Sequence, residues 1–144
     1  KNVKGPRVLV IGVGQVGVEI TEKLGKEGYD VVAVEIVDQM GGAMEGITKK
    51  LALTRIEQLE KVTLMPQTAV KAFKADGVEV EKDGEIVSLE PFQSVILASG
   101  MLSAPEPDNE IKKAINNIEI IGDADTVKDT FTAVRAGYEL ACKY

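Results

Sequence analysis

Three glycines and one acidic residue near the start of the chain carry the pattern best suited to chemistry. Gly12, Gly14 and Gly17 have the spacing G-x-G-x-x-G and follow the apolar run Val8–Ile11. Such glycines let the backbone come close to a pyrophosphate, and the helix after them offers its first N–H groups to the anion. Glu35 stands 18 residues after Gly17, close to the spacing of about 20 at which a carboxylate binds an adenosine ribose.

The motif assigns a role to each glycine. Gly12 is expected to turn the chain off its strand, Gly14 to leave room for a pyrophosphate, and Gly17 to let the helix pack on the sheet. The N–H groups at the start of that helix would face the phosphates, where the helix dipole favours an anion. The candidate cofactor-binding residues in this part of the chain are Gly12, Val13, Gly14, Gln15, Val16, Gly17, Glu35 and Ile36.

The carboxylate of Glu35 also indicates which nucleotide the site prefers. It can accept hydrogen bonds from both ribose hydroxyls, and it repels a 2′-phosphate. No Arg stands within Ile36–Gln39 to bind such a phosphate. We therefore expect NAD(H) rather than NADP(H). The alternative is that the glycines only form a tight turn and that Glu35 is a solvated strand end.

A strand–helix–strand unit must hold these residues in place. Hydrophobic patterning predicts a strand over 7–11, a helix over 14–26, a strand over 31–35, a helix over 47–60 and a strand over 62–65. Gly28 is placed to end the first helix. In the second helix we expect Leu51, Ile56 and Leu59 to face the core.

The pattern then changes to short alternating strands. Segments 69–74, 77–82 and 85–90 are joined at Asp76-Gly77 and Asp83-Gly84, which are strong hairpin signals. We therefore predict an antiparallel three-stranded meander inserted in a parallel sheet. The expected fold class is α/β, a Rossmann-like three-layer domain.

The remaining chain is expected to complete the sheet. The predicted elements are a buried strand over 95–98, a surface loop over 101–110, a last strand over 118–121 and a helix over 130–143. The strand over 118–121 would add to the sheet as its last parallel strand. The final helix is expected to place its apolar residues roughly on one side, namely Phe131, Val134, Tyr138 and Cys142.

The meander followed by Val95–Gly100 resembles the pyridine-nucleotide half of two-dinucleotide-binding flavoproteins, the pyridine nucleotide-disulfide oxidoreductase superfamily. The resemblance is greatest to NADH:flavin oxidoreductases of the 2,4-dienoyl-CoA reductase, 2-enoate reductase and trimethylamine dehydrogenase group. It implies that Ser99 and Gly100 lie near the cofactor. It also implies that Val70 forms a wall for the adenine ring.

The segment Ile118–Ala124 looks like the second FAD motif of that superfamily, in which an aspartate binds the ribityl chain. The resemblance therefore assigns Gly122 and Asp123 to FAD in a parent protein. It divides the chain into an NAD(H)-binding domain over 1–104 and a terminal strand and helix over 105–144. Because the first FAD motif and the flavin barrel are absent, it implies a fragment with flavin-carrying domains upstream.

The function implied is positioning of NADH for hydride transfer to a flavin in an NADH-dependent oxidoreductase. No residue of this chain is predicted to be catalytic, since the chemistry belongs to the cofactors. The alternative is a stand-alone dinucleotide-binding sensor or regulatory module without electron transfer.

Composition excludes several other classes of function. The chain has 144 residues, a net charge of −6, no His and a single Cys, so a nucleic-acid or anionic membrane partner is not expected. The apolar runs are too short for a membrane span, and a cytoplasmic location is expected. Oligomers are compatible with this composition.

Two further groups of charged residues have the composition of a ligand site. Asp123, Asp125 and Asp129 lack the glycine and the acid that a calcium loop needs, so no metal is predicted. Lys49-Lys50 is expected to be a solvated helix face, with phosphate contact the lesser alternative.

Overall fold

The computed structural model describes residues 3–42, 44–103, 107 and 109–144. The chain divides into two compact units, Lys1–Gly100 and Met101–Tyr144. The first unit begins with β1 (Arg7–Ile11), α1 (Gln15–Lys26), β2 (Asp30–Val34), α2 (Gly46–Glu57) and β3 (Val62–Met65). These elements confirm the strand–helix–strand unit that the apolar pattern predicts.

A parallel sheet brings the candidate residues to one edge. Its strand order is β3-β2-β1-β7, where β7 is Ser94–Leu97, and all neighbours run parallel. The register places Ile11 beside both Val34 and Leu97. Since these are the last residues of their strands, the glycine turn, Glu35 and Ser99 all follow the same carboxyl edge of the sheet.

The inserted meander is also confirmed. It consists of β4 (Thr68–Lys74), β5 (Gly77–Lys82) and β6 (Glu85–Leu89), which pair antiparallel in chain order. Asp83 and Gly84 both have positive φ, 54° and 82°, as a two-residue hairpin turn requires.

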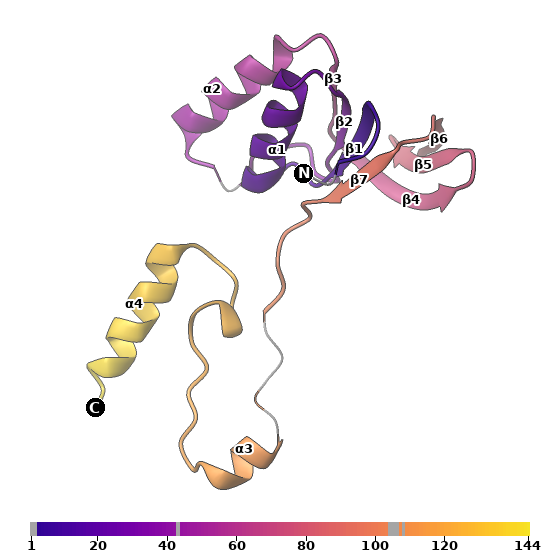
Figure 1. Cartoon of the computed structure of the whole chain (residues 1–144). Coiled ribbons are helices and arrows are strands. Elements are labelled where there is room, and N and C mark those ends of the chain that lie inside the picture. Colours follow the sequence, from indigo (N-terminus) through magenta and orange to yellow (C-terminus); the bar gives the residue numbers. More distant parts are fainter. Residues whose placement is uncertain (1–2, 43, 104–106, 108) are drawn as a thin grey trace. The chain divides into compact units, whose positions relative to one another are not determined.

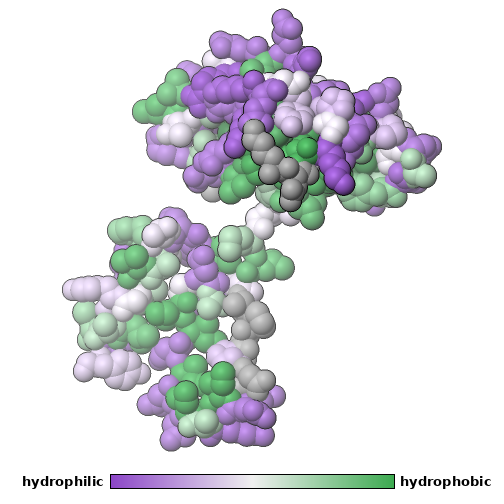
Figure 2. All heavy atoms as spheres, viewed as in Figure 1, coloured by the Kyte–Doolittle hydropathy of each residue, from purple (hydrophilic) through white to green (hydrophobic). Residues whose placement is uncertain are grey.

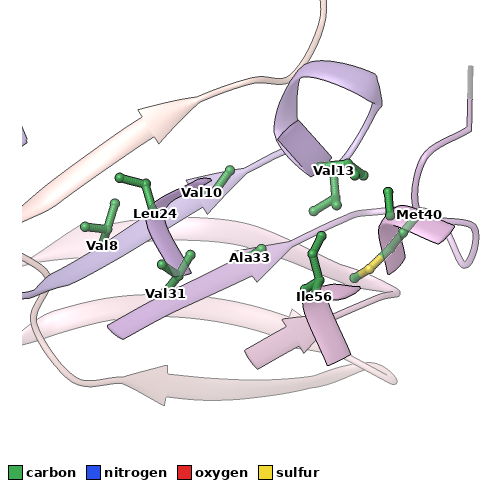
Figure 3. Packing of buried hydrophobic residues seen from close by; sticks show 10 residues of the cluster. Val8, Val10, Val13, Leu24, Val31, Ala33, Met40 and Ile56 are labelled. Atoms are coloured by element: carbon green, nitrogen blue, oxygen red, sulfur yellow. The ribbon is translucent and has the colours of Figure 1, made fainter. Parts of the chain in front are cut away.

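Helices α1 and α2 lie on one face of the parallel sheet and the meander lies on the other (Figure 1). Each face contributes to a separate hydrophobic core. Val8 and Val10 of β1 point toward α1 and α2, whereas Leu9 between them packs under the meander with Val78 and Val80. Figure 3 shows the helix-side cluster, with Val13 and Met40 at the end where the strands point. Burial on both faces explains why β1 and β2 have no polar interruption.

The burial of two elements differs from expectation. Leu51 is 55% exposed, and the neighbouring Ala52 is buried with Ile56. In β7, Val95 is 40% and Leu97 is 73% exposed, so the prediction of a buried strand is wrong. Because β7 is an edge strand, the meander covers its neighbours but leaves Leu97 open.

The second unit contains α3 (Asn109–Ala114), the 3-10 turn η1 (Gly122–Ala124) and α4 (Thr130–Ala141). The predicted strand over 118–121 is wrong: this segment is irregular and pairs with no described residue. An extended segment becomes a strand only when its backbone groups find a partner strand. The loop expected over 101–110 includes 104–106 and 108, outside the described residues, and it ends in the unpredicted α3.

The apolar side chains of α4 are exposed. Phe131, Val134 and Tyr138 follow helical spacing, and each is at least 66% exposed. Figure 2 shows hydrophobic residues on the surface of this unit. None of its described residues is buried, so they form no hydrophobic core.

Candidate functional site

Two glycines of the turn are required by the protein's own packing. Gly12 has a φ of +91°, and a Cβ on it would lie 2.6 Å from the carbonyl oxygen of Ala98. A Cβ on Gly17 would lie 2.0 Å from the carbonyl oxygen of Gly12. The turn therefore fits tightly between β7 and the first turn of α1, and neither position accepts a side chain.

Gly14 differs from both. Its φ of −70° is ordinary, and a Cβ built on it would meet no atom within 4 Å. Neither backbone strain nor internal packing explains a glycine here. The backbone at the start of α1 consequently faces open space, as it must if a pyrophosphate is to approach it.

The N-terminus of α1 also has no side-chain cap and no acidic residue in its first turn. Gly14 is its N-cap and supplies no side chain. By contrast, Glu45 caps α2 by accepting from the N–H groups of Ile47 and Thr48, and Asp129 caps α4 through Thr132. These hydrogen bonds lower the pKa of Glu45 and of Asp129. The start of α1 retains the donors and the dipole that an anion needs.

Glu35 contacts the glycine turn directly. Its Oε2 accepts a hydrogen bond from the Val13 N–H at 2.7 Å, and its Oε1 accepts a longer one from the Val37 N–H at 3.3 Å. On the other side of the same residue, the Gly41 N–H donates to the Val13 carbonyl at 2.6 Å. Val13 is therefore held through both of its backbone groups.

The backbone of Glu35 is fixed by the connection between β3 and β4. Its N–H donates to the Met65 carbonyl at 2.9 Å, and its carbonyl accepts from the Thr68 N–H at 2.8 Å. Gln67 completes this connection in a left-handed conformation, with φ of 51°, and donates to the Val37 carbonyl at 3.2 Å. Both backbone groups of Glu35 are thus hydrogen-bonded, which fixes the position from which its carboxylate extends.

Several other predicted residues surround the same edge. Ile36 is exposed next to Glu35, and Gln15 and Val16 are exposed in the first turn of α1. Ser99 follows β7, and a Cβ on Gly12 would lie 2.7 Å from its Cα. The structure thus brings the turn, the acid and the end of β7 together.

The structure also describes Val70, Gly122 and Asp123, three further predicted residues. Val70 packs against the meander-side cluster around Leu9, so its side chain contributes to that core. Gly122 and Asp123 belong to the second unit. There Gly122 adopts a φ of +63°, and Asp123 Oδ1 accepts from the Lys128 N–H at 3.4 Å.

Sequence reasoning missed the contribution of the loop after β2. Met40 is buried beside Val13 in the helix-side core, and Gly41 takes a φ of +65° to donate to that same residue. The Gly41-Gly42 pair was a visible signal of an unusual turn, but it carried no information on the partner.

An ion pair joins α1 to α2. Arg55 of α2 donates to both oxygens of Glu22, Nε at 2.5 Å and Nη2 at 2.9 Å, and Lys26 contacts the same carboxylate. These cations lower the pKa of Glu22 from 4.5 to about 2. The carboxylate of Glu22 thus accepts from both helices.

Neither a metal cluster nor a membrane-spanning helix is found among the described residues. No three of their His, Cys, Asp or Glu side chains gather as metal ligands would. None of the helices that they form combines the length and apolar character needed to cross a bilayer.

Comparison with known proteins agrees with this geometry. The family model of pyridine nucleotide-disulphide oxidoreductases matches residues 1–134. The chain belongs to this family. The resemblance to this superfamily that was drawn from the sequence is therefore confirmed.

Individual relatives extend the comparison. The chain is 29% identical to a cinnamate reductase of Clostridium sporogenes over 98% of its length, and 30% identical to an NADH oxidase of Thermoanaerobacter brockii over 96%. It covers 21% of each relative. The solved histamine dehydrogenase from Rhizobium sp. 4-9 shares the fold, with a TM-score of 0.80 and 21% identity over 97% of this chain and 23% of that one. The chain thus spans about a fifth of these curated relatives.

Proposed function

We propose that this chain is the NAD(H)-binding domain of a larger flavin-dependent oxidoreductase, and that it orients the nicotinamide for hydride transfer to the flavin. The observation that carries the proposal is Gly14. It is the one glycine of the motif whose missing side chain neither the backbone conformation nor the surrounding protein explains. A phosphate group close to the backbone accounts for it.

The residues present fit a dinucleotide. The uncapped N–H groups of α1 would bind the pyrophosphate, and the carboxylate of Glu35 would accept from the adenosine ribose. Each oxygen of Glu35 accepts one backbone N–H, from Val13 or from Val37, and each retains a lone pair for a ribose hydroxyl. Ser99 and Gly100 follow β7 at the same edge, where we place the nicotinamide end.

Hydride chemistry is supplied by the bound cofactors, and the chain contributes binding and orientation. The Gly12 and Gly17 contacts keep the start of α1 directed at the edge of the sheet. Glu35 selects against a 2′-phosphate by charge. The relative described as an NADH oxidase supports the choice of nucleotide.

The flavin part of the proposal rests on the second unit. Gly122 and Asp123 are proposed to contact FAD in the longer protein. The exposed apolar residues of α4 would then be covered by the rest of that flavin domain. The fraction of the relatives that this chain spans supports a multidomain parent.

Calorimetric titration of the purified chain with NADH and NADPH tests the proposal. We expect NADH to bind at least about tenfold more tightly than NADPH, because a repulsive charge contact near a surface is worth about 1.4 kcal/mol or more. No oxidation of NADH is expected without a flavin. Equal affinities would contradict the role of Glu35, and absence of binding would contradict the function.

A further inference from the structure

Lys49 lies in the first turn of α2, against the loop that holds the glycine turn. A Cβ built on Gly41 would lie 3.0 Å from Lys49 Cδ and 3.1 Å from Cγ. Gly41 itself donates to the Val13 carbonyl at 2.6 Å. The methylene groups of Lys49 therefore pack on Gly41, the residue that is hydrogen-bonded to Val13 of the glycine turn.

The two adjacent lysines of α2 differ in their surroundings. Lys50 is exposed, as a solvated helix face requires, whereas Lys49 is partly buried. No hydrogen bond or ion pair joins the Lys49 ammonium to any residue that the structure describes. By contrast, Lys26 and Arg55 of the same helix pair both contact Glu22.

A pyrophosphate at this turn carries more negative charge than the N-terminus of α1 offsets, so a nearby cation would strengthen its binding. A helix N-terminus offers about half an elementary charge, and the ligand carries about two negative charges. The chain is acidic overall, with a net charge of −6, and the carboxylate of Glu35 lies at the turn itself. A cation nearby would offset both sources of repulsion.

We propose that Lys49 binds the pyrophosphate of the dinucleotide with its ammonium, alongside the N–H groups at the start of α1. Its stem packs on Gly41, and the atoms beyond Cδ remain free to turn toward the anion. The assignment rests on the proposed function, because it concerns the same site. It makes Lys49 a determinant of affinity for ligands that contain a pyrophosphate.

The test compares ligands that differ in the pyrophosphate. NADH and ADP-ribose contain it and are titrated by calorimetry, whereas adenosine lacks it and is followed by NMR titration. Lys49→Met keeps the packing on Gly41 but removes the charge. We expect it to weaken NADH and ADP-ribose about fivefold to tenfold and to leave adenosine unchanged. Higher salt should shrink this difference.

Two further variants make the result specific. Lys50→Met removes a neighbouring charge from the exposed face and is expected to change no affinity by more than about twofold. Lys49→Arg restores the charge and should return NADH binding to within about twofold of the wild type. Thermal unfolding of each variant tests whether the fold is retained.

The outcomes separate the assignment from the function on which it rests. If the wild-type chain binds NADH but Lys49→Met matches Lys50→Met, the role of Lys49 is wrong and the proposed function stands. Equal weakening of adenosine and ADP-ribose would also overturn it, since that reports lost packing. If the wild-type chain binds no NADH, both are overturned.

Discussion

The carboxylate of Glu35 and the N–H of Val13 are 2.7 Å apart and hydrogen-bonded, although 22 residues separate them in the chain. The acid at the end of β2 and the glycine turn after β1 are thus one structural unit. Glu35 therefore has two roles that experiments must separate. It holds the glycine turn through Val13, and it is proposed to bind the ribose of the ligand.

Glu35→Ala is expected to cost about 1–3 kcal/mol of NADH affinity, because a charge-assisted hydrogen bond to the ribose is lost. It should also reduce discrimination against NADPH, since the repulsive charge is removed. Calorimetric titration with both nucleotides measures the two effects. Asp38→Ala removes an exposed carboxylate three residues later and serves as the control. A similar loss in both variants would refute a direct ribose contact.

Gly14→Ala and Gly17→Ala should separate binding from folding. A Cβ at Gly14 meets open space, so we expect a stability change within about 1 kcal/mol but a clear loss of NADH affinity. A Cβ at Gly17 would collide with the Gly12 carbonyl, so Gly17→Ala should lower the free energy of unfolding by about 1–3 kcal/mol or more. Urea denaturation and nucleotide titration of both variants are required. If Gly14→Ala bound NADH as tightly as the wild type, the pyrophosphate would not lie close to the backbone of Gly14.

The Glu22 ion pair predicts a dependence of stability on pH. The pKa of Glu22 is lowered from 4.5 to about 2 in the folded chain, so its contribution is complete above about pH 4.5 and is lost as the pH falls toward 2. Glu22→Gln should cost about 1–2 kcal/mol at pH 7.

Urea denaturation between pH 7 and pH 3 measures this effect. The difference between wild type and Glu22→Gln should narrow as the pH falls, whereas Glu27→Gln, at an exposed position, should run parallel to the wild type. A constant difference for Glu22→Gln would mean that the pair does not act through the carboxylate charge.

Two residues of α2 test the packing of the helix. Ile56 is 1% exposed and Leu51 is 55% exposed. Ile56→Ala should lower the free energy of unfolding by about 2–5 kcal/mol through a cavity in the helix-side core. Leu51→Ala should change it by no more than about 0.5 kcal/mol. If both variants lost a similar free energy of unfolding, the assignment of Ile56 to the core face of α2 and of Leu51 to its exposed face would be wrong.

The first unit could be predicted closely because its signals are local. Unbroken apolar runs specify β1 and β2, and the turn pairs at Asp76-Gly77 and Asp83-Gly84 specify the meander. The site followed from the spacing of the glycines and Glu35. What the sequence did not reveal is the contact of Gly41 with Val13, since a loop's partner depends on the tertiary fold.

The segment 118–121 shows the opposite case. Its residues Ile118-Glu119-Ile120-Ile121 have strand-like composition, yet no described strand pairs with them. β propensity depends on a neighbouring strand and a surface to pack on, so it cannot specify a strand alone. The exposure of Leu97 could not be predicted for a similar reason. Whether β7 lies at the edge of the sheet depends on the order of all its strands.

The fixing of Val13 between Glu35 and Gly41 has a consequence for the thermodynamics of recognition. A loop that becomes ordered only around its ligand loses conformational entropy at the moment of binding, and its affinity falls accordingly. Here both backbone groups of Val13 are engaged by the protein's own hydrogen bonds, so that ordering is already achieved by folding. The turn is preorganised, and the amide proton of Val13 should exchange slowly with solvent even in the nucleotide-free protein.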